Sequence, residues 1–93
     1  MRTIERSSQF KRDYRREKSG PRRAKIDEDF TALVTLLVRD GPLPVRYVDH
    51  ALSGNLRGLR DCHLYPDLVL LYEKPNSHLL RLVRLGSHSE LGL

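Results

Sequence analysis

The spacing of hydrophobic positions changes once along this chain, near its middle. In the first half, Ile26, Phe30, Leu33 and Leu37 follow one another at intervals of four, three and four residues. This spacing puts all four side chains on one face of a helix. From about Leu56 onward, hydrophobic residues alternate with polar ones or form short runs, which is typical of strands. The pattern therefore predicts mainly helix in the first half and mainly sheet in the second.

The N-terminal elements are marked by residues that start and stop helices. Residues 2–6 allow a short opening strand, and the two serines that follow can cap a helix over about Gln9–Lys18. Gly20 and Pro21 break that helix. Because proline is well tolerated at the first helical position, we expect a second helix to begin at Pro21 and to carry the hydrophobic face.

Three strands are expected in the second half, at Leu56–Leu64, Leu68–Tyr72 and His78–Leu85, with turns at residues 65–67 and 75–77. The middle run is hydrophobic on both faces, so it should lie at the centre of the sheet. The sequence thus predicts one α+β domain over its 93 residues. In it, an N-terminal helical hairpin packs on one face of a small, mostly antiparallel sheet of three or four strands.

A loop and a final helical turn frame these strands. A glycine and two prolines within residues 41–44 end the second helix and open a loop that runs to about Gly54. Ser87–Glu90 has serine at the cap position and glutamate three residues later, which is the pattern of a capping box. We therefore expect one more helical turn there, with His88 at its start.

Positive charge is concentrated at the N-terminus. The formal charge is +5, from 17 basic and 12 acidic residues. Residues 1–25 contain ten Lys or Arg and three acidic residues, so this part carries +7 and the remainder −2. Such asymmetry indicates a surface for a polyanion or an acidic protein, although a basic run can also be a solvated helix face. The candidate RNA-binding residues of this region are Arg15, Arg16, Arg22 and Arg23.

Cysteine content and the length of hydrophobic runs indicate the cellular compartment of the protein. Cys62 is the only cysteine, which excludes an intramolecular disulfide and a thiolate metal cluster. No hydrophobic run approaches the roughly 20 residues that span a bilayer, and the first residues lack the hydrophobic stretch of a signal peptide. We therefore expect a soluble cytoplasmic protein with no membrane partner.

Three histidines of the second half, His50, His63 and His88, lie beside acidic and basic residues. Imidazole titrates near neutral pH, so it can give or take a proton. Cleavage of RNA by its own 2′-hydroxyl needs a base for that hydroxyl, an acid for the departing 5′-oxygen and positive charge near the phosphate. Antiparallel strands with short turns can bring the three histidines and Asp67 to one edge of the sheet. The sequence predicts acid–base chemistry on an RNA phosphodiester.

Arginines on the predicted strands could bind the phosphate, because guanidinium is a planar, bidentate donor. The candidates are Arg60, Arg81 and Arg84. By strict alternation Arg81 and Arg84 point to opposite faces, so both can serve only if a bulge intervenes. His78 lies next to a turn, and we interpret it as an ordinary solvated residue.

The same histidines and aspartates could instead bind zinc, since imidazole and carboxylate are ordinary zinc ligands. However, the three histidines are separated by 13 and 25 residues, and the chain has no His-x-x-x-His or Cys-x-x-Cys pair. We expect no metal and no cofactor.

With these residues the chain resembles the YafQ-type toxins, a branch of the RelE/ParE superfamily of bacterial type II toxin–antitoxin systems. The resemblance covers nearly the whole chain. It rests on Tyr47 to Gly54, Gly58 to His63, Pro66-Asp67, Leu70 to Tyr72, Leu79 to Arg81, and Arg84 to His88 with Leu91.

The resemblance implies a RelE-like fold and a ribosome-dependent endoribonuclease that cuts mRNA in the decoding site without a metal. It also implies a cognate antitoxin, through which alone the complex would contact operator DNA. By position, it assigns catalytic roles to His50, His63, His88, Asp67 and Arg84. It therefore favours Arg84 over Arg81.

Two positions depart from the family pattern. Leu68 stands where the family has an aromatic residue after the aspartate, and Gly92-Leu93 replaces an aromatic residue near the C-terminus. Stacking of a base on an aromatic ring is worth about 1–3 kcal/mol. Substrate affinity or codon preference is therefore expected to differ from that of family members with both aromatic residues.

Two other functions are compatible with part of the pattern. A noncatalytic gyrase inhibitor of the ParE branch would have a similar fold but would not need the three histidines. A plain RNA-binding module would need only the basic N-terminal region. The histidines favour the nuclease.

Overall fold

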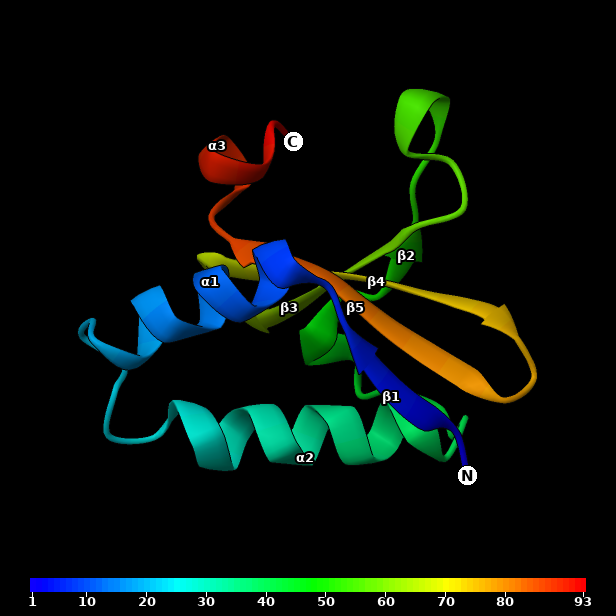
Figure 1. The fold of residues 1–93 in the computed structure, drawn as a ribbon, viewed down its shortest axis with the longest axis horizontal. Coiled ribbons are helices and arrows are strands. Elements are labelled where there is room, and N and C mark those ends of the chain that lie inside the picture. Colours follow the sequence, from blue (N-terminus) through cyan, green and yellow to red (C-terminus); the bar gives the residue numbers. More distant parts are fainter.

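The computed structural model describes residues 1–93 and has the predicted α+β architecture (Figure 1). Its elements in chain order are β1 (Thr3–Arg6), α1 (Ser8–Lys18), α2 (Ile26–Val38), the 3-10 turn η1 (Val45–Tyr47), β2 (His50–Ala51), the 3-10 turn η2 (Gly54–Leu56), β3 (Arg60–Tyr65), β4 (Leu68–Asn76), β5 (Leu79–Gly86) and α3 (His88–Leu91). No helix combines the length and the hydrophobicity that a membrane-spanning segment needs.

The strands form one sheet in the order β1-β5-β4-β3-β2. Only β1 and β5 are parallel, and the other neighbouring pairs are antiparallel. The sheet has five strands where the sequence predicted three or four, because β2 is only two residues long and lies within the expected loop. The hydrophobic run at the start of β4 is central, as predicted.

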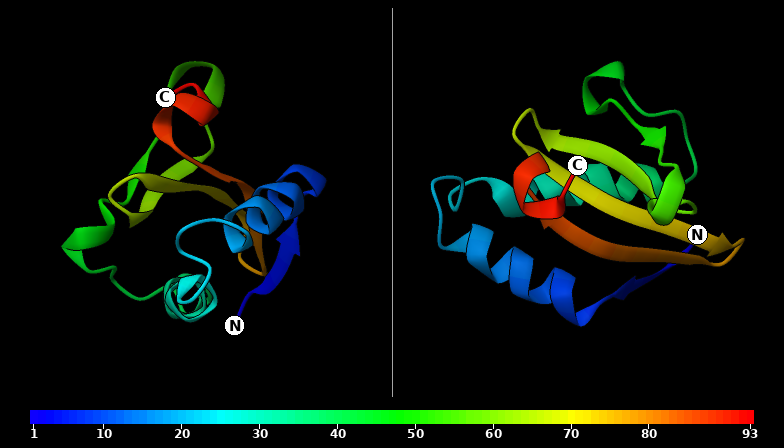
Figure 2. Two further views of the ribbon diagram at one scale, coloured as in Figure 1. Left: turned by 90° about the vertical axis from the view of Figure 1, so that its left-hand side faces the viewer. Right: turned by 90° about the horizontal axis from the view of Figure 1, so that it is seen from above.

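The two faces of the sheet have different surroundings (Figure 2). α2 lies below one face, called here the inner face, where Leu68, Leu70 and Tyr72 of β4 join the hydrophobic core. Val69 and Leu71 are also buried but alternate to the opposite, outer face. α3 and the η2 loop stand on that outer side, as the left view of Figure 2 shows. α3 and the η2 loop therefore border the outer face, and no long helix covers it.

The helices follow the sequence prediction except at one boundary. Ser7 caps α1 by accepting a hydrogen bond from the Phe10 N–H. The second helix begins at Ile26 rather than Pro21, so that prediction was wrong. The residues between form single turns, in which the Lys25 N–H donates to Arg22 O at 3.1 Å. Ile26 is fully buried, and the acidic first turn of α2 suits a helix N-terminus.

Two strand boundaries also differ from the prediction. The expected strand from Leu56 begins only at Arg60, because η2 and a glycine with φ of +99°, Gly58, turn the chain first. β4 continues to Asn76, so the hairpin turn falls on Ser77 and His78.

α1 completes the edge of β5 beyond the end of β1. β1 pairs with β5 only as far as Leu82. After that, the Ser7 hydroxyl donates to Val83 O at 2.7 Å, and Arg16 donates to Leu85 O at 2.9 Å. Asp13 accepts from the Leu85 N–H at 3.0 Å. Side chains of a helix thus satisfy backbone groups that a longer strand would have paired.

Candidate functional site

The sheet register places two of the three histidines on the outer face. His50 of β2 lies opposite Asp61 of β3, and His63 lies opposite Val69 of β4. Directly opposed residues of neighbouring strands share a face, and residues two apart on one strand do too. His50, Asp61 and His63 are therefore neighbours on the outer face.

These side chains gather around the carboxylate of Asp61. His63 Nε2 lies 3.4 Å from Asp61 Oδ1, and His50 Nε2 lies 3.8 Å from Oδ2. The His63 and His88 rings meet edge to face, with centroids 5.1 Å apart. A ring nitrogen of His88 also lies within 4.8 Å of the Asp61 carboxylate, so three imidazoles from three separate segments surround one acidic group.

Asp61 lies within the Gly58 to His63 motif, but sequence reasoning assigned it no role in the site. Its side chain is buried, and Oδ1 accepts no hydrogen bond, because its 3.4 Å contact with His63 Nε2 lacks hydrogen-bond geometry. Buried polar atoms are nearly always hydrogen-bonded. The signal that could have identified it is its position two residues before His63 on a predicted strand.

His50 is oriented by a strained loop. Val48 has φ of 48° and ψ of 43°, a left-handed conformation that β-branched residues rarely adopt. Its carbonyl lies 2.8 Å from His50 Nδ1. Because a carbonyl can only accept, Nδ1 carries the hydrogen and Nε2 is the nitrogen left for proton transfer.

His88 is positioned by α3 and the glycine before it. The predicted capping box is confirmed: the Ser87 hydroxyl accepts from the Glu90 N–H, and the Glu90 carboxylate accepts from the Ser87 N–H. Gly86 is buried, and a Cβ there would come within 3.2 Å of Glu90 Oε1 and 3.3 Å of Leu91 Cδ2. A glycine lets the short helix fold close against β5.

A bulge in β5 decides where the arginines point. Leu71 pairs with Arg84, but the next β4 residue, Tyr72, pairs with Leu82, so one extra β5 residue is inserted. Arg81 and Arg84 therefore both lie on the outer face, although strict alternation would separate them. Arg84 shares a cross-strand row with Leu71 and Asp61, whereas Arg81 is held in ion pairs with Glu5 and Glu73.

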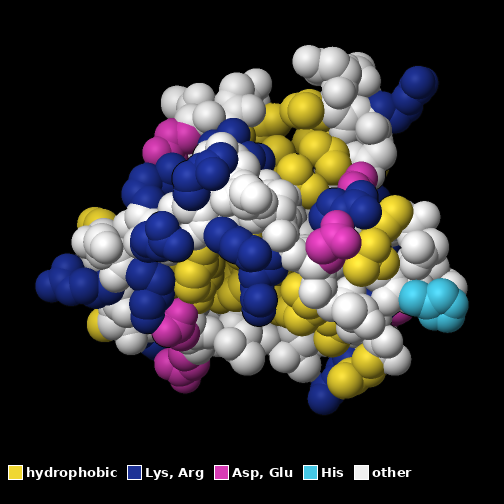
Figure 3. All heavy atoms as spheres, in the orientation of Figure 1, with side chains coloured by type: hydrophobic (Ala, Val, Ile, Leu, Met, Phe, Trp, Pro, Cys, Tyr) yellow, Lys and Arg dark blue, Asp and Glu magenta, His cyan; other side chains and the backbone are white.

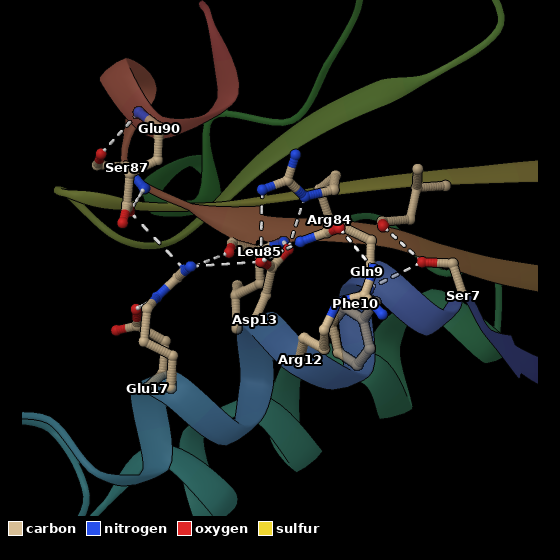
Figure 4. Close-up of polar contacts among 12 residues, drawn as sticks. Ser7, Gln9, Phe10, Arg12, Asp13, Glu17, Arg84, Leu85, Ser87 and Glu90 are labelled. Carbon is tan, nitrogen blue, oxygen red and sulfur yellow. Dashed lines mark hydrogen bonds and ion pairs between the residues drawn. The ribbon is translucent and has the colours of Figure 1, made fainter.

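Arg84 is bound by Asp13 of α1 (Figure 4). Arg84 Nε lies 2.7 Å from Asp13 Oδ2, and the Asp13 side chain is 1% exposed. Burial by itself would raise the pKa of Asp13, but hydrogen bonds from Arg84, the Leu85 N–H and Gln9 outweigh burial and lower it. Sequence reasoning missed this residue, because Asp13 lies 71 positions from Arg84 within a basic run.

Asp67 forms its polar contact with Arg22 and not with the histidines. Its side chain is 73% exposed in the β3–β4 turn and forms an ion pair with Arg22. The Arg22 guanidinium also lies 3.9 Å from the centre of the Tyr65 ring. No hydrogen bond or ion pair joins Asp67 to a histidine. The next residue, Leu68, is buried in the core and offers no surface for stacking.

Arg60 lies on the inner side of the sheet, in register with Tyr72. Its guanidinium binds Asp49 at 2.7 Å, and Asp49 also accepts from the Tyr72 hydroxyl. Burial would raise the pKa of Asp49, but these two hydrogen bonds lower it. Arg60 is thus committed to an internal ion pair.

The remaining candidate arginines belong to the basic N-terminal region. Arg15 and Arg23 are exposed, while Arg16 contacts Asp13 at 3.3 Å and Glu17 at 3.1 Å. Lys and Arg side chains gather over the left half of the face in Figure 3, where α1 and the connector to α2 lie. Arg15 and Arg23 are the candidates without an ion pair.

The fold also assembles a set of possible metal ligands. One ligand atom from each of Asp61, His63 and His88 lies within 4.8 Å of the others. The prediction of no metal rested on local spacing, which does not register ligands brought together from β3 and α3. Imidazole and carboxylate donors suit zinc or copper.

Comparison with known proteins shows which family the chain resembles over nearly its whole length. The family model for YafQ, a bacterial toxin of type II toxin–antitoxin systems, matches residues 2–92. The mRNA interferase toxin YafQ of Escherichia coli K12 is 41% identical over 92 residues, which are 98% of this chain and 96% of that protein.

Two solved structures are similar over almost the full length of both chains. YafQ in the E. coli DinJ–YafQ complex superposes with a TM-score of 0.83 and 38% identity, covering 98% of each chain. A copper-bound mutant toxin from Helicobacter pylori superposes with a TM-score of 0.89 and 32% identity, covering 98% of this chain and 99% of that one. The chain therefore belongs to the YafQ family of bacterial type II toxins.

Proposed function

We propose that this protein is an mRNA interferase of a toxin–antitoxin module, which cuts mRNA on the ribosome and so stops translation. The observation that carries the proposal is the group of three imidazoles around the buried Asp61 carboxylate. A gyrase inhibitor or an RNA-binding module would have no use for that group. The name of the E. coli relative, an mRNA interferase toxin, supports the same activity.

The steps of the reaction are assigned to side chains of the outer face. One imidazole accepts the proton of the 2′-hydroxyl as its oxygen attacks the phosphorus, and a second imidazole protonates the departing 5′-oxygen. Arg84 donates to the nonbridging oxygens, where negative charge builds up in the transition state. His50, His63 and His88 supply the imidazoles. The family resemblance adds Asp67 to the proposed set. In the structure its carboxylate forms an ion pair with Arg22.

Metal is not required for this chemistry, because positive charge comes from arginine and the proton carriers are side chains. We expect a transition metal to inhibit instead. A copper or zinc ion held by Asp61, His63 and His88 would occupy the imidazole lone pairs that proton transfer needs. The copper-bound mutant toxin from H. pylori supports metal binding by a chain of this fold.

Partners follow from the charge and from the relatives. Ribosomal RNA would meet the exposed basic residues of the N-terminal region, and mRNA would meet the outer face. The DinJ–YafQ complex supports a cognate antitoxin. For a chain of charge +5, we expect an antitoxin with an acidic or amphipathic segment that folds on binding. Contact with operator DNA would come only through that antitoxin, and the site of action would be the cytoplasm.

In vitro translation with primer extension on the mRNA, with and without ribosomes, tests the activity. His50→Ala, His63→Ala and His88→Ala should each weaken cleavage about 10²–10⁴-fold, the usual worth of one general acid or base. His78→Ala is the matched control, because His78 is exposed in the β4–β5 turn, and it should cut like wild type. Near-normal cleavage by all three alanine variants, or equal damage from His78→Ala, would refute the site.

Expression in a bacterium tests the biological role. The chain alone should arrest growth, and co-expression of the neighbouring antitoxin gene should restore it. Normal growth with abundant folded protein would contradict the toxin proposal. Inhibition of gyrase supercoiling by the purified chain, without mRNA cleavage, would favour the ParE-like alternative.

A further inference from the structure

We infer that Asp13 of α1 is a positioning residue for Arg84, turning its guanidinium so that one free edge faces the outer side of the sheet. The inference rests on the proposed function, in which Arg84 stabilises the phosphate. Asp13 itself would touch neither substrate nor reacting atoms.

The contact between the two residues is side-on. Arg84 Nε donates to Asp13 Oδ2 at 2.7 Å, and Nη2 donates to Oδ1 at 3.4 Å. Two parallel contacts fix the direction of the guanidinium plane, whereas a single contact would let the plane rotate. Nη1 has no partner in the protein, and in Figure 4 the free end of Arg84 points away from α1, toward the side on which α3 stands.

The free edge suits a phosphodiester. A guanidinium has five N–H donors, of which the Asp13 contacts occupy Nε–H and one Nη2–H. The two hydrogens on Nη1 and the second on Nη2 remain, and one hydrogen from each of these two nitrogens forms the edge that can bind two oxygens of a phosphate. Asp13 therefore leaves the phosphate-binding edge open while it holds the opposite edge.

Asp13 is itself rigidly held, which makes it a suitable anchor. It is almost fully buried and accepts from the backbone N–H of Leu85, the residue next to Arg84. Gln9 donates to Oδ1 at 3.3 Å, and Arg16 lies at the same distance. One carboxylate thus fixes both the side chain of Arg84 and the adjacent backbone of β5.

The charge of Asp13 has a cost for phosphate binding. A carboxylate beside Arg84 reduces the attraction of that arginine for an anion. A gain in orientation must outweigh this loss, since a misplacement of about 1 Å at a reacting group can lower a rate by about 10²-fold. The inference therefore predicts an effect on the rate of the chemical step more than on binding.

A double-mutant cycle on single-turnover mRNA cleavage, at saturating ribosome concentration, tests the inference. Asp13→Asn keeps the size of the side chain and an acceptor for Leu85 but loses the charge. We expect it to slow cleavage about 10–100-fold, with a ribosome half-saturation concentration within about 2-fold of wild type. In an Arg84→Gln background, Asp13→Asn should change the rate by less than about 2-fold. Equal losses in both backgrounds, or no loss in the wild-type background, would overturn the inference.

Two further variants cover the case in which Asp13→Asn does not fold. Arg84→Lys leaves Asp13 intact and keeps a positive charge but cannot form the side-on pair, so its rate should fall nearly as far as that of Arg84→Gln. Near-wild-type cleavage by Arg84→Lys would show that a point charge suffices and would refute positioning. Gln9→Ala, which removes a 3.3 Å contact to Asp13 but leaves the contacts of Asp13 with Arg84 and the Leu85 N–H in place, is the control and should cleave like wild type.

An NMR measurement separates this inference from the proposed activity. The Arg84 Nε–H signal of the free protein should exchange slowly with water in the wild type and in Gln9→Ala. Rapid exchange in the wild type would refute the Asp13–Arg84 pair even if cleavage occurs. A protected signal in a wild-type chain that cuts no mRNA would instead refute the proposed function, and the positioning role with it.

Discussion

Replacing Asp13 with alanine should destabilise the fold strongly, because it leaves two kinds of donor without their partner. The Leu85 N–H is buried and loses its acceptor, which costs about 1–3 kcal/mol. Arg84 loses a charged hydrogen bond worth about 1.5–3 kcal/mol. Its side chain is 31% exposed, so water recovers part of that loss. We therefore expect Asp13→Ala to lower the free energy of unfolding by about 3 kcal/mol, near the lower end of the sum of these two costs.

Urea and thermal unfolding followed by circular dichroism measure this effect. For a domain of 60–100 residues, 1 kcal/mol corresponds to a shift in Tm of about 4–8 °C, so Asp13→Ala should melt about 12–24 °C below wild type. Asp13→Asn keeps an acceptor for the Leu85 N–H and should lose about half as much free energy. A loss below about 1 kcal/mol for Asp13→Ala would refute the reasoning.

The same residue predicts a pH dependence with a definite sign. The folded-state pKa of Asp13 is lowered, mainly by hydrogen bonds that overcome its burial. Its ionised form therefore stabilises the fold at pH values above the ordinary aspartate pKa, and this stabilisation is lost as the pH falls through the folded-state pKa. The difference in unfolding free energy between wild type and Asp13→Asn should persist at neutral pH and shrink in acid. A difference that grows in acid would contradict the assignment.

Three further predictions concern the surface and the chemistry. Arg15→Gln with Arg23→Gln, which removes two exposed charges that form no ion pair, should weaken ribosome binding and flatten its salt dependence; an unchanged salt slope would place the polyanion surface elsewhere. Cleavage should persist when EDTA is added together with enough free magnesium to keep the ribosome assembled. Loss of cleavage under these conditions would argue for a catalytic metal. Copper(II) should inhibit the wild-type chain, and His88→Ala should lower copper affinity in calorimetry; copper binding unaffected by that change would remove the proposed ligand set.

The sequence alone determined the features that depend on neighbouring residues. The hydrophobic stripe from Ile26 to Leu37 specified the buried face of α2, and the capping box at Ser87–Glu90 specified α3. The two-sided hydrophobic run at the start of β4 specified the centre of the sheet. These patterns span a few residues, and local geometry is enough to interpret them.

The histidines illustrate how far this reasoning reaches. Their residue type and their places near strand ends predicted a shared site, and the structure brings His63 and His88 together on the outer side with His50 beside Asp61. The exposed Asp67 makes its contact with Arg22 instead. Sequence position could not separate these cases, because an ion pair between the α1–α2 connector and the β3–β4 turn depends on how both segments fold back.

Tertiary structure alone decided the details on which the chemistry depends. The inserted residue in β5 turns Arg84 to the face of Arg81, and no alternation count reveals a bulge. Asp13 reaches Arg84 across 71 positions because α1 takes over the edge of β5 after β1 ends. Asp61, His63 and His88 become a possible metal site only when α3 folds over the sheet. Such contacts join segments far apart in the chain, so they follow from packing and register rather than from any local pattern of residues.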